Sequence, residues 1–190
     1  MSTHPIALNV RELTSETWPD FETLFRSRGG PRYCWCMVWR GTPAETKIAT
    51  SASRRDAMRS RVERATHVGL LAYRDEHPVA WCSVGPRDTF QMRMAGRLDG
   101  DTEERVWSLT CFFVTREFRH QGAIYVLIDA AKAHARAHGA TVLEAYPVAP
   151  DSPSYRFGGF LSAFERAGFA EVGMAGSRRH VVRYRLTEAA

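Results

Sequence analysis

The hydrophobic pattern is clearest in the middle of the chain, where an apolar run precedes a helical repeat. Residues 106–114 (VWSLTCFFV) are nearly all apolar, which is typical of a central strand covered on both faces. Further on, apolar residues recur at i, i+3, i+4, i+7 and i+11, the spacing of one helix face, at Ile124, Leu127, Ile128, Ala131 and Ala135. Gly139 ends the repeat, and residues 141–146 supply another strand. We therefore expect a strand-turn-helix-strand unit.

The N-terminal third predicts one strand and several helices. Residues 6–13 alternate loosely, as in an opening strand, and Pro19 suits the first turn of a helix that ends before Gly29. Thr42 and Glu45 form a capping box around Pro43, which predicts a helix start. A further helix is predicted to start at Ser53 and Asp56, with Met58, Val62 and Ala65 on its apolar face.

Strands are predicted on both sides of the central unit. Residues 68–73 and 79–84 read as a hairpin around a polar turn. Near the C-terminus, residues 161–167 suggest a short helix, and alternation through Val182, Tyr184 and Leu186 suggests a half-buried edge strand. Together the elements predict an α+β fold in a single domain, residues 1–190. We expect a mixed, mostly antiparallel central sheet flanked by helices, with a parallel strand pair on either side of the helix 123–139.

Composition narrows the classes of protein that fit. The formal net charge is +5, but no run of five basic residues occurs, which disfavours nucleic acid as a partner. No stretch approaches the ~18 apolar residues of a membrane span, and the first residues lack the pattern of a secretion signal. The four cysteines lie in apolar company, which fits a reducing compartment. We expect a cytoplasmic protein without a membrane partner.

The turn between the apolar run and the helix carries the main functional signal. It reads Arg119-His120-Gln121-Gly122-Ala123. Glycine lets the backbone approach a ligand closely, and the first N–H groups of a helix are unpaired and lie at its positive end. Such a turn binds anions such as a diphosphate, although the same glycine would also suit a plain tight turn.

At these residues the sequence resembles the GNAT superfamily of acyl-CoA-dependent N-acyltransferases. Its signature is Arg or Gln, two residues, Gly, one residue, then Gly or Ala; Arg119 and Gly122 match it, whereas Ile124 replaces the second small residue. The good match covers residues 106–173. A Tyr-Cys-Trp-Cys-Met segment at residues 33–37 also resembles a group of uncharacterised bacterial members.

The resemblance implies acetyl-CoA as co-substrate and no metal. It places the pantetheine in a split between two strands and the diphosphate on the turn, with Phe164 where many members carry a tyrosine that acts as general acid. The implied cofactor-binding residues are Phe112, Phe113, Val114, Arg119, His120, Gln121, Gly122, Ala123, Ile124, Tyr125 and Phe164. The pair Cys34 and Cys36 lacks a partner pair at zinc-like spacing, so zinc is not expected there.

The expected catalytic groups depart from the family pattern. Ser108 stands where many members carry a glutamate base, and it could instead hold a water. Glu144 is a carboxylate within a strand, although a salt-bridged structural role is the stronger interpretation. Tyr146, or Tyr155, could replace the missing acid, or the thiolate could leave unaided. The predicted catalytic residues are therefore Ser108, Glu144 and Tyr146.

Aromatic residues offer a candidate acceptor pocket, because family acceptors lie against the connection that follows the first helix. The candidates are Tyr33, Trp35, Trp39, Trp81 and Trp107. The alternative is that these rings belong to the core.

The predicted function is transfer of an acetyl group from acetyl-CoA to a primary amine of a small molecule, by direct attack in a ternary complex. Two alternatives remain: an acyl-CoA sensor without turnover, and an aminoacyl-tRNA-dependent transferase of the same fold. A homodimer is a further expectation.

Overall fold

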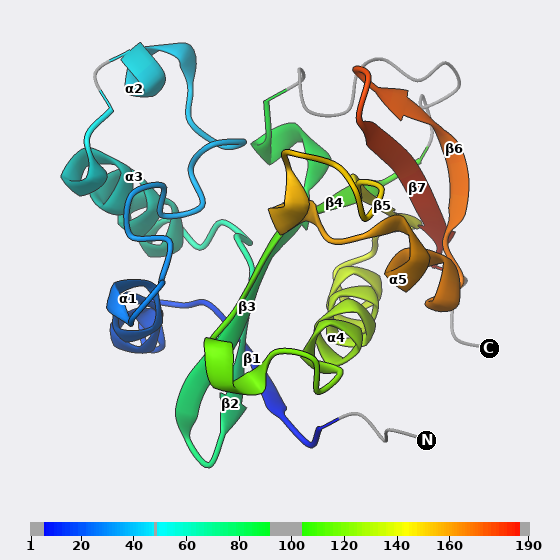
Figure 1. Cartoon of the computed structure of the whole chain (residues 1–190). Helices are drawn as coiled ribbons and strands as arrows, with labels where there is room; N and C mark the ends of the chain where they lie inside the picture. Colours follow the sequence, from blue (N-terminus) through cyan, green and yellow to red (C-terminus); the bar gives the residue numbers. More distant parts are fainter. Residues whose placement is uncertain (1–5, 48, 92–103, 187–190) are drawn as a thin grey trace.

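A seven-stranded sheet forms the centre of the molecule in the computed structural model, which describes residues 6–47, 49–91 and 104–186. The strand order is β1-β2-β3-β4-β5-β7-β6 (Figure 1). The strands are β1 Asn9–Glu12, β2 Leu70–Arg74, β3 His77–Pro86, β4 Val106–Val114, β5 Val142–Ala145, β6 Ala170–Ala175 and β7 Arg179–Arg185. Within the described residues, β4 and β5 pair in parallel and the other neighbours are antiparallel. The predicted mixed, mostly antiparallel sheet is confirmed.

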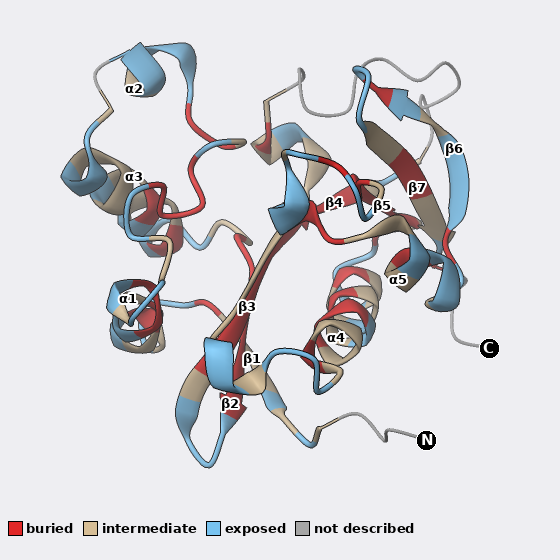
Figure 2. Cartoon of the chain, in the orientation of Figure 1, coloured by how far each residue is buried: buried red, intermediate tan, exposed pale blue. Residues whose placement is uncertain are grey.

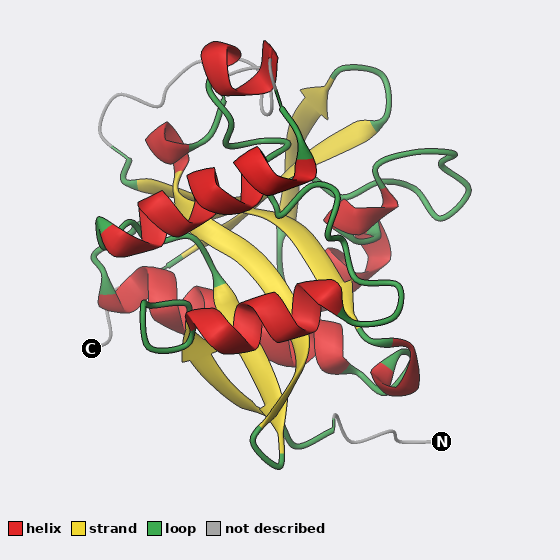
Figure 3. Ribbon diagram, turned by 90° about the vertical axis from the view of Figure 1, so that its left-hand side faces the viewer, coloured by secondary structure: helices red, strands yellow, loops and turns green. Residues whose placement is uncertain are grey.

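Helices cover both faces of this sheet. They are α1 Trp18–Arg26, α2 Pro43–Lys47, α3 Ser51–Glu63, α4 Ala123–Ala137 and α5 Leu161–Arg166, with 3-10 turns η1 Arg87–Thr89, η3 Arg116–Phe118 and η4 Arg156–Gly158. Helices α4 and α5 lie on one side of the sheet, and α1 and α3 lie on the other (Figure 1), the side that Figure 3 turns toward the viewer. The connection from β4 to β5 runs through α4, which gives the parallel pair.

Side chains alternate between two cores, one on each face of the sheet. In β2, Leu70 and Ala72 face the α4 side, whereas Leu71 and Tyr73 face the α1 side. Figure 2 shows β3 and β4 buried at the centre of the molecule. This double covering explains why the middle of the chain reads as continuously apolar.

The predicted central unit is confirmed almost residue for residue. Helix α4 buries Leu127, Ile128, Ala131 and Ala135 completely, and Gly139 follows it with φ +78°. Strand β4 has the predicted bounds, but its second half, from Cys111 to Val114, is half-buried rather than covered on both faces.

Three predictions about the flanking elements were wrong. Thr50, not Ser53, caps α3: its hydroxyl accepts the Ser53 N–H at 3.1 Å, and Ser53 closes the capping box. The helix ends at Glu63, so Ala65 is exposed beyond it. Strand β7 is not an edge strand, because it lies between β5 and β6 and buries Val181 and Val182.

Candidate functional site

The start of α4 presents a glycine turn whose first amides have no acceptor in the part of the chain that the structure describes. Gly122 caps the helix in the left-handed region, with φ 82° and ψ 6°. The N–H of Tyr125 donates to the Gly122 carbonyl at 3.0 Å, so the N–H groups of Ala123 and Ile124 precede the first N–H that finds an acceptor in the helix. The N–H groups at this turn thus lie at the positive end of the α4 dipole.

Side chains in the turn fold back onto its own backbone. Arg119 Nε donates to the Val114 carbonyl at 3.0 Å, and Gln121 Nε2 donates to the Glu117 carbonyl at 2.6 Å. His120 has a positive φ of 62° and is exposed. These contacts hold the loop between β4 and α4 in one conformation.

The departure at Ile124 does not close the turn. Its side chain packs against the core on the α4 side, and a Cβ built on Gly159 would lie 3.5 Å from Ile124 Cδ1. The aliphatic group thus points toward η4 and Phe112, while Tyr125 follows it, half-buried, on the same first turn. Ile124 can still offer its backbone N–H to an anion.

Strands β4 and β5 separate beside this turn. They pair from Val106 with Val142 to Leu109 with Ala145, and beyond that point β3 is the strand that pairs with β4 among the described residues. Thr110 sits at a bulge, since Ser83 pairs with Cys111 and Val84 with Leu109. Its buried Oγ1 has no hydrogen-bond partner among the described residues. The backbone of Phe112, Phe113 and Val114 therefore borders a fork in the sheet.

The three predicted catalytic residues meet at the base of this fork. Ser108 lies opposite Glu144 in the parallel pair, and its Oγ is 3.0 Å from the Tyr146 hydroxyl. The Tyr146 hydroxyl donates to Glu144 Oε1 at 2.5 Å. Because the phenol has one proton and a carboxylate only accepts, Ser108 must donate to the Tyr146 oxygen. Proton donation therefore runs in one direction, from serine to tyrosine to glutamate.

Burial keeps the Tyr146 phenol protonated. Ser108 and Glu144 have no exposed surface, and Tyr146 is 2% exposed. Burial, followed by the Glu144 charge, raises the pKa of Tyr146 well above its ordinary value. The phenol therefore keeps its proton at neutral pH and acts as a fixed hydrogen-bond donor.

Arginines that were not predicted hold Glu144. Arg183 Nε donates to Glu144 Oε2 at 2.7 Å, and Arg87 Nε lies 3.6 Å from Oε1. Arg183 also pairs with Glu104 at 3.0 Å. Glu144 is therefore a salt-bridged carboxylate within a strand, the role that the sequence favoured for it. Only the alternation of Arg183 along its strand gave any local sign of the pairing.

The predicted aromatic residues do not gather in one place. Trp35 and Trp81 are buried with Phe21 and Phe25 in the core on the α1 side. Trp107 lies against His138, with ring centroids 5.6 Å apart.

Of the remaining predicted aromatics, Tyr33 is 66% exposed. Trp39 packs against a small apolar cluster that includes Phe90 and Tyr146. Phe164 is fully buried and packs edge-on against Phe112.

Trp39 belongs to a surface that we call the aromatic rim, made of Trp39, Tyr155 and Arg179. The Arg179 guanidinium lies 4.7 Å from the Trp39 ring centroid and 5.3 Å from that of Tyr155. Tyr155 has a positive φ of 61° and is 37% exposed. Two rings and a cation from three separate segments thus meet above Tyr146.

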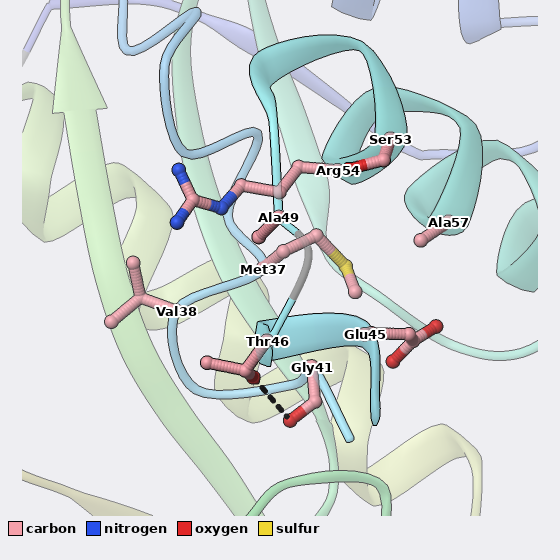
Figure 4. A pocket seen from close by; sticks show the side chains of 9 residues that line it. All are labelled: Met37, Val38, Gly41, Glu45, Thr46, Ala49, Ser53, Arg54 and Ala57. Atoms are coloured by element: carbon pink, nitrogen blue, oxygen red, sulfur yellow. Dashed lines mark hydrogen bonds between the residues drawn. The ribbon is translucent and has the colours of Figure 1, made fainter. Parts of the chain in front are cut away.

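A hollow of about 200 Å³ is formed by the connection that follows α1, by α2 and by the first half of α3 (Figure 4). It is lined by Met37, Val38, Gly41, Glu45, Thr46, Ala49, Ser53, Arg54 and Ala57. None of the predicted aromatic residues lines it. Figure 4 shows Met37 and Thr46 at its centre and the Val38 side chain directed away from α3.

Comparisons with known proteins agree with this geometry. Residues 11–160 match the family described as "Acetyltransferase (GNAT) family". No curated protein sequence matches the chain. Among the described residues, no helix has the length and apolar character that crossing a membrane requires.

Solved structures share the fold at low identity. An N-acetyltransferase from Staphylococcus aureus is 12% identical with a TM-score of 0.57, over 96% of this chain and 100% of that one. A "histone acetyltransferase HPA2 and related acetyltransferase" from Corynebacterium glutamicum is 16% identical with a TM-score of 0.57, over 94% and 96%. The PaiA N-acetyltransferase from Thermoplasma acidophilum, solved with coenzyme A, is 12% identical with a TM-score of 0.50, over 95% and 99%. The family match over most of the chain, the shared fold and the glycine turn beside the parted strands lead to one conclusion: this chain belongs to the GNAT family of acetyltransferases.

Proposed function

We propose that the protein transfers an acetyl group from acetyl-CoA to a primary amine of a small molecule, by direct attack in a ternary complex. The observation that carries the proposal is the glycine turn of α4 beside a fork in the sheet that ends at Ser108 and Tyr146. The turn suits a diphosphate, and the fork suits an extended chain that leads from the diphosphate to the buried cluster.

The residues at the turn and the fork fit acetyl-CoA by their backbone groups. The N–H groups of Gly122, Ala123 and Ile124 would hold the diphosphate at the positive end of α4, with Arg119, His120 and Gln121 around them and Tyr125 behind. Phe112, Phe113 and Val114 would offer the open edge of β4 to the pantetheine amides, as in strand addition. Phe164 would support Phe112 from the core.

The acceptor must reach the thioester as a neutral amine. At pH 7 an ordinary amine is neutral in about one molecule in two thousand, which costs about 4 to 5 kcal/mol. Ser108 donates its proton to Tyr146, so its oxygen lone pairs are left to accept a hydrogen bond from a water or amine that enters the fork. Ser108 is thereby a positioning acceptor, and Tyr146 and Glu144 fix its direction.

The leaving thiolate does not require Tyr146 as an acid. A free thiol has a pKa of about 8.5, whereas the Tyr146 phenol holds its proton far more tightly, so proton transfer to the thiolate would be uphill. The cluster is better suited to orientation than to proton transfer.

The aromatic rim is the acceptor side that we favour. Trp39 and Tyr155 give an apolar wall over the fork, and Arg179 adds a positive charge. A cation there disfavours a protonated amine and favours an acceptor that also carries an acidic group. The hollow in Figure 4 is a second candidate, because it lies against the same connection after α1.

Two measurements test the proposal. Calorimetric titration with acetyl-CoA gives binding, and thiol release across a panel of amino acids, polyamines, amino sugars and peptides gives turnover. We expect micromolar binding and release with a small amine that bears an acidic group. Binding without release on any acceptor would favour the sensor. Binding to tRNA that survives moderate salt, without affinity for CoA, would favour the aminoacyl-tRNA-dependent transferase.

A further inference from the structure

Three histidines and one glutamate converge on the α4 side of the sheet, far from the turn that suits acetyl-CoA. They are Glu12, His67, His134 and His138, and we call them the histidine cluster. Their potential ligand atoms all lie within 4.8 Å of one another. No element of the proposed acetyl transfer uses them.

The four residues come from three separate parts of the chain. Glu12 ends β1, His67 lies in the connection from α3 to β2, and His134 and His138 lie one turn apart at the end of α4. His134 is about 16 Å along the helix axis from Ala123, at 1.5 Å per residue. A ligand at the histidine cluster would therefore not touch the glycine turn.

The ring contacts suit metal ligands. His138 Nδ1 lies 2.9 Å from the His134 carbonyl, which only accepts, so Nδ1 carries the proton and Nε2 presents its lone pair. A ligating histidine usually makes such a contact with its other nitrogen. His67 Nδ1 lies 2.6 Å from Glu12 Oε1, and His134 Nε2 lies 3.7 Å from the same oxygen.

His134 is the member that packing alone explains least. Its Nε2 is buried and has no hydrogen-bond partner among the described residues. A buried ring nitrogen without a partner is costly unless something occupies the space in front of it.

We propose that Glu12, His67, His134 and His138 form a zinc site that ties β1 and the α3–β2 connection to the end of α4. Three imidazoles and a carboxylate are a donor set that Zn²⁺ favours, and bonds of about 2.0–2.1 Å place tetrahedral ligand atoms about 3.3 Å apart. The present separations are up to 4.8 Å, so binding would require the four side chains to move closer together. The site opens to solvent through His138, which is exposed.

The site is structural by this proposal. Four protein ligands leave no open position for a reacting group, unlike a catalytic zinc centre. The ion would link residues 12 and 67 to residues 134 and 138, so it would act on stability rather than on acetyl transfer. It revises the expectation from sequence that the protein holds no metal.

The test uses the full-length protein without an affinity tag, stripped by chelator and titrated with Zn²⁺. We expect one Zn²⁺ per chain, and at a hundredfold excess over Kd a rise in melting temperature of about 5–10 °C. Co²⁺ in place of Zn²⁺ should give the visible absorption of a tetrahedral site. His134→Gln should weaken binding at least about 100-fold, beyond what loss of a supporting partner alone usually costs.

A matched control is His180→Gln. His180 Nδ1 contacts Glu171 Oε1 at 2.8 Å, which copies the His67–Glu12 contact, and no further potential ligand joins this pair in the described part of the chain. Zn²⁺ affinity should be unchanged in this variant, and acetyl-CoA affinity should be unchanged in both. The proposal is overturned if no stoichiometric zinc binds, or if His134→Gln and the parent bind it equally well. In either case the cluster is only a ring stack on Trp107.

Discussion

Gly122 holds a left-handed backbone conformation at the start of α4, with φ 82°. A branched side chain there would move the backbone and misdirect several N–H donors together. Two or three lost hydrogen bonds to a charged group, each worth about 1.5 to 3 kcal/mol, correspond to at least a hundredfold loss of affinity. Calorimetry should show this loss for acetyl-CoA in Gly122→Val, with circular dichroism close to the parent. Arg119→Ala should lose less, since the amides remain. Equal binding by Gly122→Val and the parent would place the diphosphate elsewhere.

At the same scale, Tyr146 joins Ser108 to Glu144 by hydrogen bonds in a fully buried place. Tyr146→Phe keeps the ring but leaves the Glu144 oxygen and the Ser108 hydroxyl with one partner fewer. We expect a loss of about 1–3 kcal/mol in the free energy of unfolding, measured with urea, and a lower kcat with unchanged affinity for acetyl-CoA. Tyr155→Phe, at an exposed position of the aromatic rim, should leave stability within about 0.5 kcal/mol of the parent. Unchanged stability in Tyr146→Phe would show that the buried network contributes nothing.

Among the elements, α2 is short and buries none of its side chains, so its polar contacts hold it. Glu45 accepts two hydrogen bonds from Arg61 of α3, both at 2.9 Å, and these lower the pKa of Glu45 from 4.5 to about 2. A depressed pKa adds stability above about pH 4.5 that is lost as the pH falls toward 2. The stability difference between the parent and Glu45→Gln should therefore shrink over that window in urea titrations. Glu63→Gln removes an exposed pair with Arg59 and should matter little throughout. A constant difference for Glu45→Gln would contradict the linkage.

The sequence predicted those elements whose signal is local. The apolar run of β4 and the repeat along α4 reflect burial of most positions in each element, so the bounds of β4 and the start of α4 were right. Helix α4 ends at Ala137, two residues before the predicted end. The place of β7 depends on which strands it pairs with, and alternation alone could not show β6 outside it. The predicted trio of Ser108, Glu144 and Tyr146 was drawn together by strand register, but Arg87 and Arg183 were missed because their pairing joins distant segments. The histidine cluster escaped for the same reason.

The whole molecule is expected to unfold as one domain, because both cores are built on β2 and β3 and the core on the α4 side also includes residues of β5 and β7. Circular dichroism and tryptophan fluorescence should give one coincident transition. Acetyl-CoA at about a hundredfold excess over its Kd adds about 2.7 kcal/mol, which raises the melting temperature by about 5–10 °C for a chain of this size. Gly122→Val should show no such rise. Two separate transitions would contradict the single-domain prediction, and sedimentation would test the expected homodimer.

Because β4 separates from β5 after Leu109, the backbone amides of β4 fall into two groups that differ in how they are paired. From Trp107 to Leu109 both edges of β4 are occupied by other strands, whereas from Thr110 to Val114 no described strand pairs with the edge that β5 leaves. Hydrogen–deuterium exchange should therefore be slow in the first half of β4 and faster in the second. A ligand that adds its own amides to the open edge would slow the second half alone. The exchange rates of individual β4 amides would then show whether a ligand occupies the fork.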